Sequence, residues 1–138
     1  MFREICKLIE DRTGFKPPFL QIGHRVQGAP DRCVLIQESG GGETNFYCPD
    51  MANLVIQVIS RAVPREYFQA REDAYVVYEA FHGTAGWNMP NWTGTGPDYL
   101  AMTVEALAVP QYIGTDENGQ HEFSLNFIFR CEQSSCGS

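Results

Sequence analysis

The sequence predicts an α/β fold of the α+β type, in which two helices flank a single mixed or mostly antiparallel sheet. Two segments carry apolar residues at helical intervals, and five others are short apolar runs rich in β-branched and aromatic residues. The predicted order is helix, strand, strand, strand, helix, strand, strand. With 138 residues, 43% of them hydrophobic, the chain is long enough to bury one core without a disulfide or a metal. We expect one domain over residues 1–130 and a polar C-terminal tail over 131–138.

The first predicted helix covers residues 2–13, where apolar residues recur near helical spacing with charged residues between them. Gly14 follows as a typical C-terminal stop. Pro17 and Pro18 prevent the helix from continuing. Residues 19–26 then alternate apolar and polar side chains, which predicts a first strand.

Two further strands are predicted before the second helix. Residues 32–39 contain four consecutive apolar residues, a pattern typical of a strand covered on both faces. Gly40, Gly41 and Gly42 are expected to end this strand and to connect it to the next. Residues 53–61 place β-branched side chains on both faces, so we expect them to form the central strand.

The second predicted helix covers residues 65–82. Its aromatic and small apolar residues recur at intervals of three and four, and charged residues fill the opposite side. Gly83 is expected to end it.

A long hairpin is predicted over residues 99–130, with arms at 99–113 and 120–130. Apolar side chains alternate strictly along the second arm, which indicates a strand with one buried face. Pro110 lies inside the first arm and implies a sheet edge or a bulge there. The turn is expected to consist of residues that bond their own backbone or tolerate positive φ, namely Asp116, Asn118 and Gly119.

The composition argues against a protein that grips nucleic acid. The chain has 17 acidic and 10 basic residues and a net charge of −7, so on average it repels phosphate. The excess of acidic over basic residues is greatest over residues 84–138, which contain six acidic residues and one basic residue. Charged residues interrupt the N-terminus before any secretory apolar core, which predicts a cytoplasmic product. The chain has five cysteines, an odd number that fits poorly with a disulfide framework and is normal for reduced thiols.

No motif predicts a catalytic, cofactor-binding or metal site. His24, His82 and His121 lie outside any nucleophile motif. The glycine run at 40–42 lacks the Lys-Ser or Lys-Thr pair of a phosphate cradle, and the cysteines lack the paired spacing of a zinc site. We therefore expect that the protein is not an enzyme.

The most unusual segment is 83–98, which contains four glycines, two prolines and both tryptophans of the chain. We interpret it as a long functional loop. Trp87 and Trp92 either contact another subunit or pack back over the sheet, and both alternatives stay open. Phe46 and Tyr47, with the glycine run, are further candidates for a contact surface. A small-ligand-binding module with a pocket under 83–98 is the alternative from another functional class.

Five segments resemble minor capsid proteins of the phage tail terminator type. They are residues 106–116 (ALAVPQYIGTD), 118–119 (NG), 123–127 (FSLNF), 36–41 (IQESGG) and 57–61 (QVISR). The resemblance implies a small α/β virion protein that forms a homo-oligomeric ring, a hexamer in the family, at the head-proximal end of a long phage tail. Such a ring terminates the tail tube, contacts the tail-tube protein and the head connector or stopper protein, and lets DNA pass through its lumen. A role as another neck or head-completion ring is the nearest alternative.

Overall fold

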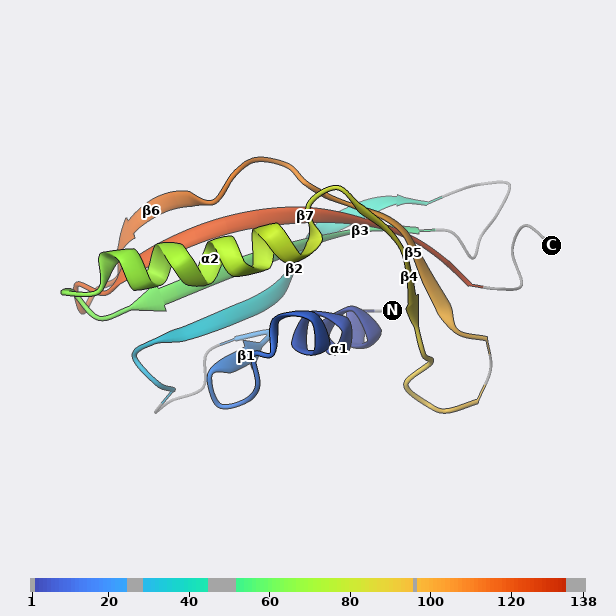
Figure 1. Ribbon diagram of the computed structural model, residues 1–138, viewed down its shortest axis with the longest axis horizontal. Helices are drawn as coiled ribbons and strands as arrows, with labels where there is room; N and C mark the ends of the chain where they lie inside the picture. The colour runs from blue at the N-terminus through green and yellow to red at the C-terminus, as the bar shows by residue number, and fades with distance from the viewer. Residues whose placement is uncertain (1, 25–28, 45–51, 96, 134–138) are drawn as a thin grey trace.

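The computed structural model describes residues 2–24, 29–44, 52–95 and 97–133 (Figure 1). Two helices and seven strands form one mixed sheet, so the predicted fold class is confirmed. The elements are α1 (Phe2–Thr13), β1 (Leu20–Ile22), β2 (Cys33–Thr44), β3 (Ala52–Ala62), α2 (Tyr67–Phe81), β4 (Thr84–Met89), β5 (Tyr99–Ala106), β6 (Gln111–Thr115) and β7 (His121–Gln133).

The sheet has the strand order β1-β2-β3-β7-β5-β4, and β6 pairs with β7 as well. Only β1 and β2 run parallel, and all other neighbours are antiparallel. The long strand β7 is central: one side pairs with β3 along its length, and the other is shared by β5 at one end and β6 at the other. Pro110 lies between β5 and β6, so the predicted single arm over residues 99–113 is wrong: it is two strands, and Pro110 belongs to the connection between them instead of to an edge or bulge within one strand.

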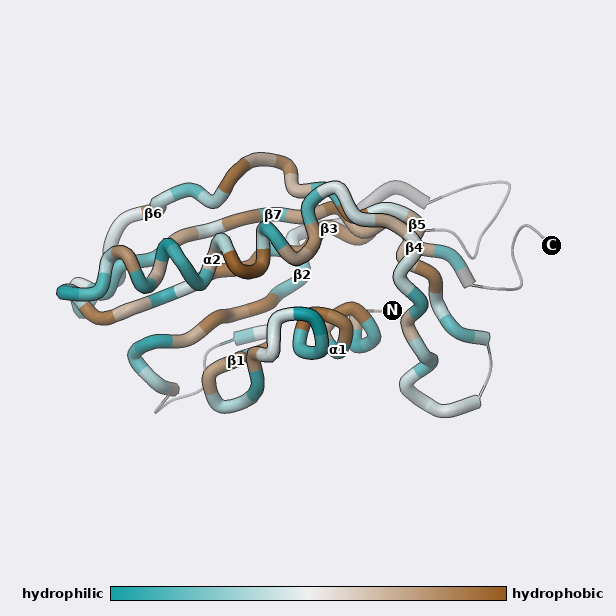
Figure 2. The backbone as a smooth tube through the Cα atoms, in the orientation of Figure 1, coloured by the Kyte–Doolittle hydropathy of each residue, from teal (hydrophilic) through white to brown (hydrophobic). Residues whose placement is uncertain are grey.

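The core lies between the sheet and the helices. The alternating residues of β7 are buried as predicted, and Phe81 of α2 packs its ring against Phe127 and Phe129 at centroid distances of 6.1 and 5.9 Å. Helix α2 packs against β3, β7 and β5, and α1 contacts α2 and β4. Hydrophobic stretches run through β2 and the C-terminal half of α2 (Figure 2). Ile5 and Ile9 of α1 are fully buried in the same cluster, so both helices cover one core.

Two further sequence predictions about segment boundaries were wrong. Residues 83–98 are not a long irregular loop, because Thr84–Met89 form β4, which pairs antiparallel with β5. Gly86 and the polar residues around it hide the alternation of a strand, and the hydrogen bonds of β5 supply what the sequence pattern lacks. With β4 added and the predicted arm over residues 99–113 divided into β5 and β6, four strands follow α2 instead of two.

The glycine run was the second wrong boundary. Gly40, Gly41 and Gly42 do not end the second strand, because β2 continues through them to Thr44. The pairing of β2 with β3 shifts register on both sides of Gly41. Glycine tolerates such irregular pairing, so here it marks bulges inside a strand.

Candidate functional site

Trp87 anchors β4 to both helices. Its Nε1–H donates to Thr84 Oγ1 at 2.8 Å, and that hydroxyl donates to the carbonyl oxygen of Phe81 at 2.7 Å. The guanidinium of Arg12 on α1 lies 4.2 Å from the centroid of the indole ring. The ring itself is partly buried against the core. Trp87 therefore contacts α1 directly and is linked to the end of α2 through Thr84, both within its own chain.

Trp92 is held in a different way and stays exposed. Its backbone N–H donates to the buried carboxylate of Glu4 at 2.7 Å, and the guanidinium of Arg3 lies 4.6 Å from its ring centroid. Burial by itself raises the pKa of Glu4, but hydrogen bonds to the carboxylate, led by the one from Trp92, outweigh it and the pKa lies below the ordinary value. The indole of Trp92 is still 57% exposed.

Hydrogen bonds order the connection between β4 and β5. Asp98 accepts from the backbone N–H of Asn91 at 3.0 Å, and the Asn91 side chain donates to the carbonyl oxygen of Pro97 at 3.1 Å. Thr93 donates from both its backbone N–H and its hydroxyl to the Asn91 side-chain oxygen. These bonds fix the position from which the Trp92 ring projects.

A hollow of about 250 Å³ lies between α1 and the end of β4. We call it the α1–β4 hollow, and its lining residues are Glu4, Lys7, Leu8, Asp11, Asn88, Met89, Pro90, Asn91 and Trp92. It is smaller than the roughly 300–1,000 Å³ of typical small-molecule sites. Its most buried polar group, the Glu4 carboxylate, is already bonded to Trp92. The hollow therefore offers an apolar recess and few groups that would orient a polar ligand.

The turn between β6 and β7 lies at the end of the sheet opposite the β4–β5 connection, where it is tied to β3 and to the segment before β2. Asp116 Oδ1 accepts from the backbone N–H groups of Asn118 and Gln120, both at 2.9 Å. Gly119 has a φ of +76°, and its N–H donates to the carbonyl oxygen of Asp116 at 3.0 Å. Arg61 donates to the carbonyl oxygens of Pro30 and Asp31, and its guanidinium lies 3.7 Å from Asp116 Oδ2.

Histidine side chains contribute packing and hydrogen bonds. His82 stacks on Tyr78 at 4.9 Å and accepts from the backbone N–H of Ala106 at 3.2 Å. His121 lies between the Tyr112 hydroxyl, 3.0 Å away, and the carbonyl oxygen of Pro64, 2.7 Å away. His24 is exposed.

The described cysteines are buried, unpaired thiols. Burial raises the pKa of Cys6 and of Cys131 to about 12, so neither is a thiolate at neutral pH. Among the described residues, no group of three or more histidine, cysteine or acidic side chains is placed to hold a metal ion. In the same part of the chain, neither helix is long and apolar enough to cross a bilayer.

Of the other predicted contact residues, the structure describes three and does not describe two. Gly40, Gly41 and Gly42 lie in the main chain of β2, far along the sequence from the tryptophans. Phe46 and Tyr47 lie outside the described residues.

Apolar side chains on and around β6 form a surface that the sequence analysis missed. Leu107, Val109, Tyr112 and Ile113 are each 44–56% exposed and follow one another along the edge of the sheet. The Tyr67 ring contacts both Tyr112 and Phe68, at 5.3 and 5.4 Å, and so links this edge to the first turn of α2. Phe68 is 72% exposed. The signal was present as apolar residues flanking Pro110, but it was interpreted only as strand pairing.

The model of a family described as bacteriophage tail terminator protein matches residues 22–133. The chain belongs to the bacteriophage tail terminator family. Among curated proteins, none matches the chain.

Membership of the tail terminator family makes the chain a structural protein of the phage tail and a virion component. The family is structural and not enzymatic, in agreement with the prediction from the sequence. The matched range extends from the end of β1 to the end of β7, and α1 lies outside it. The sheet and α2 are therefore the family's common part, and the α1–β4 hollow is formed where α1 meets it.

Two carboxylates in the acidic region of this tail terminator are paired within the subunit. Glu105 lies 3.1 Å from Arg130 on the neighbouring strand, and Asp116 lies 3.7 Å from Arg61. These pairs reduce the field that the composition of residues 84–138 suggests.

Proposed function

We propose that this chain forms a ring, a hexamer, at the head-proximal end of a phage tail, where it terminates polymerisation of the tail tube and joins the tail to the head connector or stopper protein. The observation that carries the proposal is the family match over residues 22–133, which includes six of the seven strands whole. Residues 1–130 then belong to one domain of the ring subunit, whose last strand, β7, continues to Gln133. The subunits assemble in the host cytoplasm and remain in the virion.

The exposed apolar side chains support an assembly role. Eight large hydrophobic side chains in the described part of the chain are more than 40% exposed, and half of them lie along β6 and the connection before it. Exposed apolar patches on small proteins commonly mark contact surfaces. A ring subunit needs such surfaces for its neighbours, for the tail-tube protein and for the connector.

The net charge of −7 fits a ring through which DNA passes without tight binding. A strongly acidic protein gains no affinity from counterion release. We propose that the lumen is neutral or acidic, and that the paired carboxylates Glu105 and Asp116 contribute less to its field than Glu117, which is exposed.

The experiment follows tail-tube protein as it polymerises with and without the purified chain. We expect electron micrographs to show rings of the chain alone, and tubes that carry one ring at one end and stop growing there. Tubes that grow equally long in both reactions, together with a chain that stays monomeric, would contradict the proposal. Labelling the chain in intact virions then shows where the ring lies. A label at the end of the tail supports the proposal, whereas a label in a neck layer nearer the head supports the alternative of another head-completion ring.

A further inference from the structure

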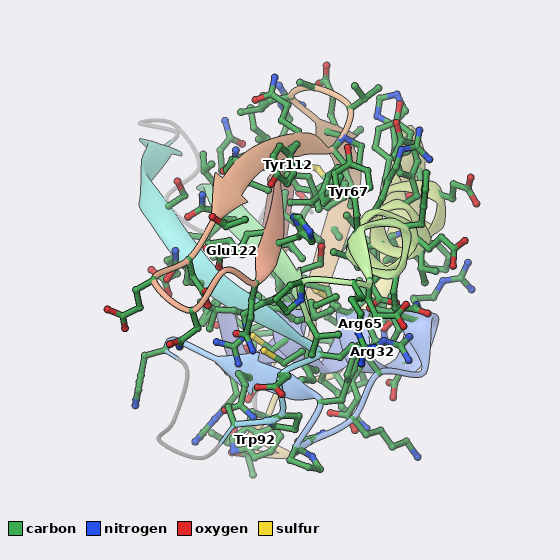
Figure 3. The ribbon with its side chains drawn as sticks, turned by 90° about the vertical axis from the view of Figure 1, so that its left-hand side faces the viewer. Arg32, Arg65, Tyr67, Trp92, Tyr112 and Glu122 are labelled. Atoms are coloured by element: carbon green, nitrogen blue, oxygen red, sulfur yellow. The ribbon has the colours of Figure 1, made fainter. Side chains whose placement is uncertain are left out.

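Two apolar surfaces of the subunit lie on opposite sides of the molecule. The first, which we call the β6 patch, consists of Phe68, Leu107, Val109, Tyr112 and Ile113. The second is the α1–β4 hollow with Trp92 at its rim. In Figure 1, β6 and the start of α2 lie at the left, whereas α1 lies below the centre and the end of β4 at the lower right. Figure 3 agrees, since Tyr67 and Tyr112 lie near the top and Trp92 near the bottom.

We infer that neighbouring subunits join head to tail, with the β6 patch of one copy packed on the α1–β4 hollow of the next and Phe68 inserted into it. The inference rests on the proposed function, because a ring of identical subunits gives each hollow a neighbour. A ring requires two different, complementary surfaces on each subunit. A β6 patch that paired with itself would give a two-fold dimer and would leave the hollow empty.

The exposed side chains favour this pairing. Phe68 and Trp92, at 72% and 57%, have the highest exposed fractions among the exposed large hydrophobic residues. One belongs to each surface, so a single type of contact would cover both. Aromatic residues in recesses dominate the energy of many interfaces. A hollow of about 250 Å³ suits one aromatic side chain better than a drug-sized ligand.

The charges of the hollow favour an apolar occupant. Lys7 and Asp11 pair with each other at 3.0 Å, and the Glu4 carboxylate accepts from the Trp92 N–H. The charged residues that line the hollow therefore have partners within the subunit. A partner that binds through its own charge gains little there, whereas an apolar patch displaces water from an apolar recess.

Two contacts of ordinary size would leave most of the subunit surface free. A standard interface removes about 800 Å² from each partner. Two such interfaces would cover roughly a fifth of the 7612 Å² surface of this subunit. The remainder stays free for the tail-tube protein and the connector.

The test uses two variants that each disable one surface. The patch variant is Phe68→Asp with Ile113→Lys. An aspartate in the first turn of α2 suits the helix dipole, and a lysine suits an exposed strand edge, so folding should be retained. The hollow variant is Asn88→Trp, which fills the recess from an exposed position of β4. Val76→Asp is the matched control, because Val76 is 41% exposed on α2 and lies outside the patch.

Sedimentation velocity then reports the assembly of the full chain. We expect rings for wild type and for Val76→Asp, monomers for each disabled variant alone, and a 1:1 dimer when the two disabled variants are mixed. The mixture stops at a dimer because it contains one intact patch and one intact hollow. Circular dichroism and urea midpoints close to wild type show that the variants are folded.

Failure of the inference and failure of the proposed function give different results. Rings from either disabled variant, rings from the mixture, or no association in the mixture would overturn the head-to-tail contact while wild-type rings uphold the proposed function. A wild type that stays monomeric, alone and with tail-tube protein, would overturn both.

Discussion

The two tryptophans should respond very differently to replacement by alanine. Removing a fully buried tryptophan costs about 3–5 kcal/mol, and since Trp87 is only partly buried we expect about half of that. Loss of the cation–π contact with Arg12 adds about 0.5 kcal/mol, and loss of the hydrogen bond to Thr84 adds little because water can replace the indole at that hydroxyl, so the total is about 2–3 kcal/mol. Trp92 is 57% exposed, so Trp92→Ala should cost no more than about 1 kcal/mol, mostly from its contact with Arg3.

Thermal and urea unfolding measure this difference. For a chain of this size, 1 kcal/mol shifts Tm by about 3 °C. Trp87→Ala should therefore lower Tm by about 6–10 °C, and Trp92→Ala by about 3 °C or less. Arg12→Ala is the control for the cation–π contact and should cost less than about 1 kcal/mol. Equal destabilisation by the two tryptophan variants would refute the roles given to them, as would a Trp87→Ala protein as stable as wild type.

Three further substitutions probe other contacts. A double-mutant cycle on Arg32 and Asp73, joined by two hydrogen bonds of 2.9 and 2.8 Å, should give a coupling energy of about 1–3 kcal/mol in urea unfolding, and a value near zero would contradict a specific pair. Glu4→Gln should destabilise the protein by about 1 kcal/mol at neutral pH. Because the folded-state pKa of Glu4 is below its ordinary 4.5, its contribution is present above that pH and lost as the pH falls through the folded value, so the gap between wild type and variant should close in acid. Gly119→Ala should cost about 1 kcal/mol because φ is +76°, while Asn118→Ala, measured alongside as the control, should cost less, and equal costs would argue against backbone strain.

Local patterns in the sequence were sufficient for the two helices and for the strands β3 and β7. Apolar spacing of three and four residues predicted α1 and α2, and the strict alternation in β7 predicted its buried face. Pro110 indicated an irregular point in the predicted arm over residues 99–113, because proline lacks the N–H that a ladder needs, but not that the arm divides into β5 and β6. These signals depend on residues within one or two turns or strand steps of each other.

The strand β4 and the continuation of β2 could not be predicted in the same way. Both contain glycines and polar residues that disfavour a strand locally, and both exist because a neighbouring strand satisfies their backbone groups. The resemblance to tail terminators came from the sequence as well, and the family match bears it out.

The candidate surfaces likewise depend partly on local sequence signals and partly on long-range contacts. The sequence by itself singled out Trp87 and Trp92 as unusual, since large aromatic side chains in a glycine-rich segment need a partner. Only the tertiary structure assigned those partners, by bringing Arg3, Glu4 and Arg12 of α1 to a segment some 80 residues away in the chain. The tertiary structure also left the apolar residues around β6 exposed. In the described part of the chain, β6 pairs with β7 on one side, and no further strand pairs with the outer edge of β6. Composition and periodicity thus determined most of the elements, whereas long-range pairing decided which side chains they bury and which they leave exposed.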